Sequence, residues 1–319
     1  MLEALKFVKG GYNSKSPLTD LHNYQIKNGR ITSFNGHFTL SALIDFDIDL
    51  CPNAEMFTKA ITGCSGKVSL SMTATGRLKV QSNKFKGFID CTKDARYFPE
   101  PDGEAIQIYS TKFIDALKKV YPIIGEDQNR PWNNGAFING NKIYATNNTI
   151  IVRADIDFEI PVKVNIPKES VKELLRLNEN PIAVQYTDRK LTFHFADDKW
   201  MTTDLLPSNW PETDFLFQEN NAVPLPVEFY TALDKLAPFV DELETIILEN
   251  GIIKTHYYSE QGGKYELDGF EGIGKYKLKQ FMLLKPFVTK IDFMTYPKPC
   301  FFTGEGIEGV LLGLKQEKE

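Results

Sequence analysis

The side chains that could do chemistry are few and poorly grouped. Asp45, Asp47 and Asp49 occupy alternate positions, which would place three carboxylates on one face of a strand. A calcium-binding loop would need Gly at its sixth position and Glu at its twelfth, where this chain has Leu50 and Met56. We therefore interpret the three carboxylates as a solvent-exposed strand face, and we expect no metal site.

The other candidate motifs are incomplete. Residues 63–67 lack the four-residue gap between glycines that a phosphate-binding loop has, and Val68 follows the lysine. No histidine has a cysteine or carboxylate partner at a useful spacing, and no Ser-His-Asp or Cys-His pair is evident. The sequence therefore predicts no catalytic residue, no cofactor and no enzymatic activity. A hydrolase or transferase built on repeated α+β units is the least favoured alternative.

Length and composition indicate a globular protein with two or three domains. The chain has 319 residues, of which 42% are hydrophobic and 25% charged, and its formal net charge is −5. This acidic balance argues weakly against a surface that coats nucleic acid. Residues 1–6 contain no apolar run typical of a signal peptide, and no stretch is long enough to span a membrane. Without a CxxC pair, the four cysteines are expected to be reduced, and the protein cytoplasmic.

Three Gly-centred turns suggest an internal repeat. Asn-Gly dipeptides end at Gly29, Gly140 and Gly251, and 111 residues separate each glycine from the next. Asn-Gly supplies the positive φ angles of a tight hairpin, so each is predicted to join two strands. Three units of this length account for almost the whole chain.

The neighbouring segments repeat in the same way. Each turn follows a helix-like stretch, and a second helix and further strands come after it. The six predicted helical stretches are residues 2–15, 52–62, 110–124, 167–178, 226–241 and 275–290. The sequence thus predicts an α+β fold of three repeated domains, in which antiparallel sheets pack under helices. The predicted domains are residues 1–103, 104–220 and 221–319, divided at the Pro-rich segments 99–103 and 220–224.

Five short motifs carry a resemblance to a known family. They are residues 130–135 (Arg-Pro-Trp-Asn-Asn-Gly), 145–148 (Ala-Thr-Asn-Asn), 166–167 (Ile-Pro), 210–212 (Trp-Pro-Glu) and 310–314 (Val-Leu-Leu-Gly-Leu). Together with the three-copy pattern, they resemble the DNA polymerase III beta-type sliding clamp. The chain is shorter than typical bacterial clamps, which suggests a divergent and possibly phage-encoded member.

The resemblance implies a ring and a set of partners. Two subunits would close head to tail as a homodimer, with the helices lining a hole and the sheets facing outward. Such a ring encircles double-stranded DNA without reading its sequence. It acts as a processivity factor in DNA replication, and it binds DNA polymerase and the clamp loader through a short apolar peptide. The implied location is the cytoplasm of a bacterial cell or a phage-infected host, with no membrane partner.

The charge distribution agrees with a DNA-lined hole. The six helical stretches carry +2, 0, +2, +1, −2 and +5, together +8, which leaves −13 for the rest of the chain. Lysine and arginine meet phosphates without base readout. The alternative is that Lys simply favours exposed helices. The candidate DNA-binding residues are Lys15, Lys118, Lys119, Lys172, Arg176, Lys275, Lys277, Lys279 and Lys285, of which Lys15 is implied by the resemblance alone.

The resemblance also implies a partner-peptide pocket between the second and third domains. Its residues would be Thr146, Thr149, Ile150, Ile151, Pro211, Leu216, Val310 and Leu312. The chain departs from the family pattern at residues 147–150, at Asn133, where an apolar wall residue is usual, and in the tail 315–319. The alternative is that these are simply core strand residues. A further alternative for the whole chain is a clamp-like adaptor or decoy that binds replication proteins without encircling DNA.

Overall fold

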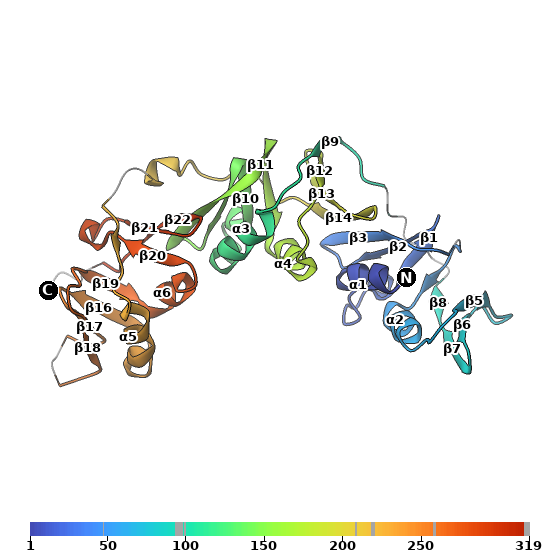
Figure 1. Cartoon of the computed structure of the whole chain (residues 1–319), viewed down its shortest axis with the longest axis horizontal. Coiled ribbons are helices and arrows are strands. Elements are labelled where there is room, and N and C mark those ends of the chain that lie inside the picture. Colours follow the sequence, from blue (N-terminus) through green and yellow to red (C-terminus); the bar gives the residue numbers. More distant parts are fainter. Residues whose placement is uncertain are drawn as a thin grey trace. The chain divides into compact units, whose positions relative to one another are not determined.

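The computed structural model describes residues 1–46, 48–92, 98, 100–207, 209–217, 221–257 and 260–315. By their internal contacts these residues form two compact units. Unit 1 comprises residues 1–111 and 169–205, and unit 2 comprises residues 112–168 and 206–319. Both units consist of antiparallel sheets with helices packed against them (Figure 1).

The main sheet of unit 1 has seven strands in the order β1-β2-β3-β14-β13-β12-β9. Their bounds are β1 Gln25–Lys27, β2 Arg30–Phe34, β3 Phe38–Leu43, β14 Lys199–Asp204, β13 Lys190–Phe195, β12 Ala183–Tyr186 and β9 Glu104–Gln107. The β3–β14 pair joins the predicted first and second domains into one sheet. Helix α1 (Leu2–Val8) packs on β2 and β3 (Figure 1), and Phe7 meets Phe195 edge-on with ring centroids 5.5 Å apart.

Two helices and two small sheets complete unit 1. Helix α2 (Ala54–Thr62) begins after Asn53, whose side chain accepts a hydrogen bond from the N–H of Met56. Helix α4 (Lys168–Leu177) is tied to the main sheet by a hydrogen bond between the hydroxyls of Ser170 and Thr203, 2.6 Å apart. The small sheets are β5-β6-β7 (Ser69–Met72, Leu78–Ser82, Phe85–Ile89) and β4-β8 (Cys51–Pro52, Cys91–Thr92).

The main sheet of unit 2 has six strands in the order β10-β11-β22-β21-β20-β15. Their bounds are β10 Gly135–Thr146, β11 Ile150–Pro167, β22 Ile307–Leu311, β21 Cys300–Gly304, β20 Val288–Ile291 and β15 Val223–Pro224. The β11–β22 pair joins the predicted second and third domains. Helix α3 (Phe113–Val120) packs on β10 and β11, and Phe113 meets Phe158 edge-on at 5.5 Å.

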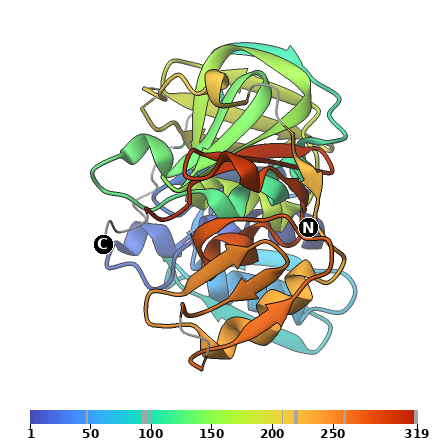
Figure 2. The same cartoon turned by 90° about the vertical axis from the view of Figure 1, so that its left-hand side faces the viewer.

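A second sheet in unit 2 has the strand order β18-β17-β16-β19 and faces the viewer in Figure 2. Its bounds are β16 Thr245–Glu249, β17 Ile252–Lys254, β18 Lys264–Glu266 and β19 Gly274–Lys277. Helices α5 (Phe229–Leu236) and α6 (Leu278–Leu284) pack beside it around Phe229 and Phe281, whose rings are 5.5 Å apart. The short 3₁₀ turns are Lys9–Gly11, Thr19–His22, Tyr121–Ile123, Pro131–Asn133, Asp214–Phe217, Ala237–Phe239 and Phe293–Thr295.

The predicted α+β class with antiparallel sheets is confirmed. Along the chain the helices come in three pairs, each separated and followed by strands, which is the predicted order. The domain boundaries stay predictions. Pro99 and Asn220, the first residues of the two dividing segments, lie outside the described residues. The contacts divide the middle copy between the two units because its strands pair with both neighbouring copies.

One of the three predicted hairpins is wrong. Gly29 and Gly251 have φ of 68° and 80° and lie in turns between paired strands, as predicted. Gly140 also has a positive φ of 60°, but it lies inside β10, where the register with β11 shifts. The Asn-Gly dipeptide therefore forms a bulge in one long strand, since pairing with β11 continues on both sides of it.

The prediction of a lysine-rich last helix at residues 275–290 is also wrong in part. Lys275 and Lys277 lie on strand β19, and α6 begins only at Leu278. Within their observed bounds the six α-helices carry 0, 0, +1, +1, 0 and +1, together +3. Most of the predicted +8 therefore lies in adjoining turns and strands. The prediction that Asp45, Asp47 and Asp49 lie on a strand is also wrong for Asp45 and Asp49, which are outside any strand. Asp47 lies outside the described residues.

Candidate functional site

The eight residues predicted for the pocket line one cavity in unit 2, with a volume of about 290 Å³. The cavity is also lined by five residues that the sequence did not single out for it, namely Trp132, Asn148, Trp210, Thr213 and Pro299. None of these thirteen side chains is ionisable, so the cavity favours an uncharged, largely apolar occupant.

The turn between β10 and β11 forms one side of the cavity. The side-chain carbonyl of Asn147 accepts hydrogen bonds from the backbone N–H groups of Thr149 and Ile150 at 3.1 and 2.9 Å. Asn148 adopts a φ of 71°, which Asn tolerates better than most residues. The hydroxyl of Thr146 donates to the carbonyl of Ile150 at 2.7 Å. The turn's polar groups thus bind one another, so they do not need a ligand.

Paired strands form the floor. Ile151 of β11 lies directly opposite Val310 of β22, and both are at least 93% buried in one hydrophobic cluster. The backbone N–H of Leu312 continues the pairing by donating to the carbonyl of Thr149 at 2.8 Å. Ile151 and Val310 are therefore core residues that also line the cavity.

The connector of residues 209–217 contributes a further part of the lining, namely Trp210, Pro211, Thr213 and Leu216. Trp210 stacks on Phe137 with ring centroids 5.0 Å apart and an interplanar angle of 1°. It also meets Trp132 edge-on at 5.3 Å. Leu216 packs against the hydrophobic cluster of the floor. Two of the chain's three tryptophans thus border the cavity, and their presence in the 130–135 and 210–212 motifs was the available signal.

Asn133, the predicted departure, does not line the cavity. It is fully buried, and neither atom of its side-chain amide has a hydrogen-bond partner among the described residues. Pro299, by contrast, reaches the cavity from the turn before β21, and nothing in the sequence pointed to it.

The nine basic candidates have different surroundings. Lys118 pairs with Asp115 at 3.1 Å, Lys285 pairs with Asp234 at 2.7 Å, and Lys119 donates to a backbone carbonyl at 2.6 Å. The Lys275 ammonium lies 5.8 Å from the centre of the Tyr257 ring, and Lys277 is exposed on β19. The remaining four are Lys15, Lys172, Arg176 and Lys279.

Arg176 is the most constrained of these. Its guanidinium donates to the carbonyls of Lys6 and Phe7 at 3.1 and 2.7 Å and to the buried carboxylate of Glu173. It therefore fixes α4 to the end of α1. Lys15, Lys172 and Lys279 are exposed, and within the described residues no ion pair or hydrogen bond of their ammonium groups is found.

No described group of three or more His, Cys, Asp or Glu side chains could hold a metal ion. The four cysteines are not joined by disulfides. Among the described residues, none of the helices has both the length and the apolar character needed to cross a membrane.

Solved structures resemble the chain over its whole length. They include a putative DNA polymerase III beta subunit from Eubacterium rectale (14% identity, TM-score 0.81) and the DNA polymerase sliding clamp from Bacillus subtilis (17%, 0.80). The Helicobacter pylori beta clamp bound to a DNA ligase peptide also matches (15%, 0.78). Each comparison covers 99% of this chain and 97% of the other.

The chain has the sliding-clamp fold. No protein-family model and no curated protein matches it, so the likeness to sliding clamps lies in the structure. The resemblance inferred from the five sequence motifs is confirmed at the level of fold.

Proposed function

We propose that this chain is a DNA sliding clamp, a ring-shaped processivity factor that encircles duplex DNA and tethers a replicative polymerase and other partners. The observation that carries the proposal is the clamp fold over 99% of the chain, with a cavity at the positions predicted for the partner pocket. The proposal includes no catalytic step.

DNA contact is assigned to exposed lysines that have no internal partner among the described residues. Lys172 on α4 and Lys279 on α6 meet this description, and they lie on helices, which line the hole in the proposed ring. Lys190 is a matched control, because it lies on β13 and points away from the sheet face that carries Leu191 and Phe193. That buried face contacts α4 through the pair of Ser170 and Thr203.

The test is duplex binding, measured by fluorescence anisotropy over a salt series. Each neutralisation, Lys172→Gln or Lys279→Gln, should reduce the slope of log affinity against log salt by up to about 0.9. Lys190→Gln should leave the slope unchanged. Equal slopes for all three variants would contradict the assignment.

The cavity is proposed to bind a short apolar peptide, as the H. pylori clamp binds a DNA ligase peptide. A blocked peptide containing Leu and Phe is the probe, and Trp132 and Trp210 report its binding by fluorescence. Leu312→Asp should weaken binding at least about tenfold, because it places a carboxylate at an apolar wall. Leu43→Asp is the control, because Leu43 is similarly exposed (48% against 40%) and lies in unit 1.

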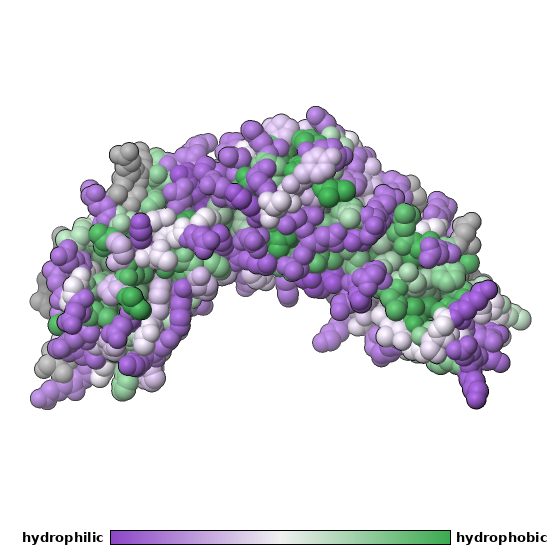
Figure 3. All heavy atoms as spheres, viewed as in Figure 1, coloured by the Kyte–Doolittle hydropathy of each residue, from purple (hydrophilic) through white to green (hydrophobic). Residues whose placement is uncertain are grey.

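Ring closure is proposed to join two copies through apolar edges. Phe88 on β7, an edge strand, is 53% exposed, and Phe239 and Leu243 after α5 are 56% and 65% exposed. Hydrophobic surface is visible over both units in Figure 3. Light scattering should give twice the subunit mass of 36.3 kDa. A strict monomer with a salt-independent DNA interaction would favour the adaptor or decoy instead.

A further inference from the structure

Two rows of side chains cross the three strands β10, β11 and β22 in register. The first row is Thr146, Ile151 and Val310, and the second row is Tyr144, Arg153 and Glu308. Positions two apart on a strand share a face, so the rows lie side by side on the same face of the sheet. All three residues of the first row line the cavity, and none of the second row does.

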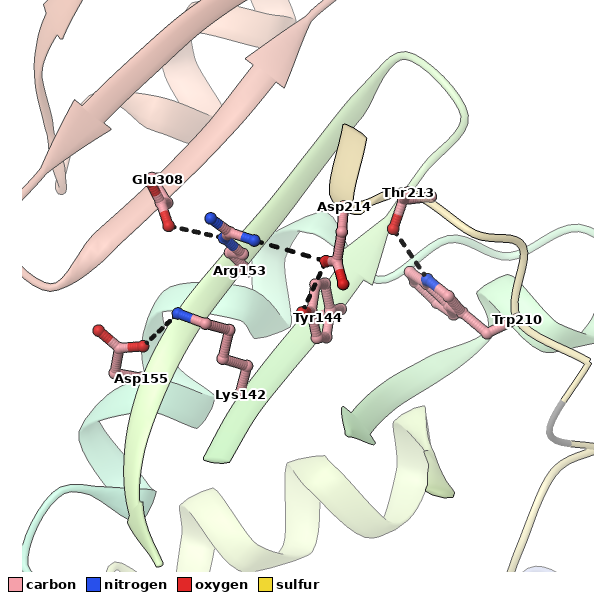
Figure 4. A network of polar contacts seen from close by, with 8 residues as sticks. All are labelled: Lys142, Tyr144, Arg153, Asp155, Trp210, Thr213, Asp214 and Glu308. Carbon is pink, nitrogen blue, oxygen red and sulfur yellow. Dashed lines mark hydrogen bonds and ion pairs between the residues drawn. The ribbon is translucent and has the colours of Figure 1, made fainter. Parts of the chain in front are cut away.

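The second row binds the connector. The Nε of Arg153 donates to Glu308 at 2.6 Å, and its Nη1 donates to Asp214 at 3.4 Å (Figure 4). The hydroxyl of Tyr144 donates to the same oxygen of Asp214 at 3.0 Å. The Arg153 guanidinium also lies over the ring of Phe217, 4.1 Å from its centre. Asp214 and Phe217 are the first and last residues of the 3₁₀ turn in the connector.

This attachment fixes the cavity wall next to it. Leu216 lies inside the attached turn and packs on the floor cluster. Thr213 directly precedes the turn, and its hydroxyl accepts a hydrogen bond from the indole Nε1 of Trp210 at 3.4 Å. The position of the Trp210 ring, which stacks on Phe137, therefore depends on where the turn is held.

The chemistry of the second row suits a fixed contact. The Arg153 side chain is only 15% exposed, although Asp214 is 61% exposed. Burial, reinforced by the hydrogen bond to Asp214, raises the pKa of Tyr144 to about 12. The phenol therefore stays protonated and donates to Asp214 throughout the neutral range.

We propose that Asp214, held by Arg153 and Tyr144, is a positioning residue that latches residues 210–216 against the sheet and thereby sets the shape of the cavity. Its effect on peptide affinity rests on the proposed function. The latch itself does not, because it concerns the wall of the cavity with no peptide present.

The test uses Trp210 as the only tryptophan, in a Trp132→Phe, Trp200→Phe background. Acrylamide quenching of Trp210 is then measured in the protein without peptide. Asp214→Ala should raise the quenching constant about twofold or more, because the released connector exposes the indole. Asp214→Asn keeps an acceptor for Tyr144 and should give an intermediate value.

Asp155→Ala is the matched control. Asp155 pairs with Lys142 at 2.7 Å one row further along the same strands, and no contact of this pair with the connector is found among the described residues (Figure 4). The Asp155→Ala substitution removes an exposed carboxylate and an ion pair, but it should leave the quenching of Trp210 unchanged.

Peptide affinity is measured in parallel with the Leu- and Phe-containing probe. Asp214→Ala should weaken binding about fivefold to tenfold, and Asp155→Ala should not weaken it. Unchanged quenching in Asp214→Ala overturns the latch, whatever the peptide does. Increased quenching with no peptide binding, even in the unsubstituted protein, supports the latch and counts against the proposed pocket function.

Discussion

The buried amide of Asn133 should destabilise the protein, and its replacement by leucine should stabilise it. No described group forms a hydrogen bond with either side-chain atom, and an unsatisfied buried polar group costs about 1–3 kcal/mol. The leucine methyl groups must fit against Gly125, since a Cβ at position 125 would lie only 3.0 Å from Asn133 Cγ, and about 1 kcal/mol is lost to crowding. We therefore expect Asn133→Leu to raise the free energy of unfolding by up to about 2 kcal/mol.

Asn134→Leu, at the next position, is the matched control. It is expected to lower the free energy of unfolding, whereas Asn133→Leu is expected to raise it. The Asn134 side chain accepts from the N–H of Asp127 at 2.7 Å and donates to the carbonyl of Asp127 at 3.1 Å. Losing both bonds should cost about 1–2 kcal/mol. Urea denaturation followed by circular dichroism measures both variants. Equal destabilisation by the two substitutions would refute the reasoning, because it would mean that Asn133 is also satisfied.

Two further predictions concern unit 1. Arg176→Ala should lower the free energy of unfolding by about 3 kcal/mol, because it leaves the buried Glu173 carboxylate unpaired. Lys59→Ala, which breaks an exposed ion pair with Glu55, should lower the free energy of unfolding far less than Arg176→Ala does. Equal losses in urea denaturation would contradict this account. Burial lowers the pKa of His194 below its ordinary 6.5, so its contribution to stability is present above pH 6.5 and is lost as the pH falls through the lower, folded-state pKa. His194→Gln should flatten the fall in melting temperature over that range, and an unchanged profile would contradict it.

The cavity residues could be named from the sequence because the resemblance to sliding clamps rests on short local motifs that contain or adjoin them. Thr146 to Ile151 form one turn, and Pro211 and Leu216 follow one tryptophan. The latch could not be predicted in the same way. Arg153, Asp214 and Glu308 are far apart in the sequence, and only the register of β11 with β22 brings them together.

Two errors arose where long-range pairing decided the local structure. Residues 275–279 alternate Lys-Tyr-Lys-Leu-Lys, which is a strand period, and pairing with β16 makes residues 274–277 a strand before the helix begins. The predicted helix at residues 275–290 therefore wrongly included Lys275 and Lys277. The Asn-Gly dipeptide at Gly140 is the same as at Gly29. The residues that flank Gly29 pair with each other, whereas those on both sides of Gly140 pair with β11.

Direct imaging of the purified protein tests the central claim most directly. In negative-stain electron microscopy at micromolar concentration, a clamp should appear as closed rings with a central opening wide enough for duplex DNA. Single subunits, or compact particles without an opening, would contradict the proposal that this chain encircles DNA.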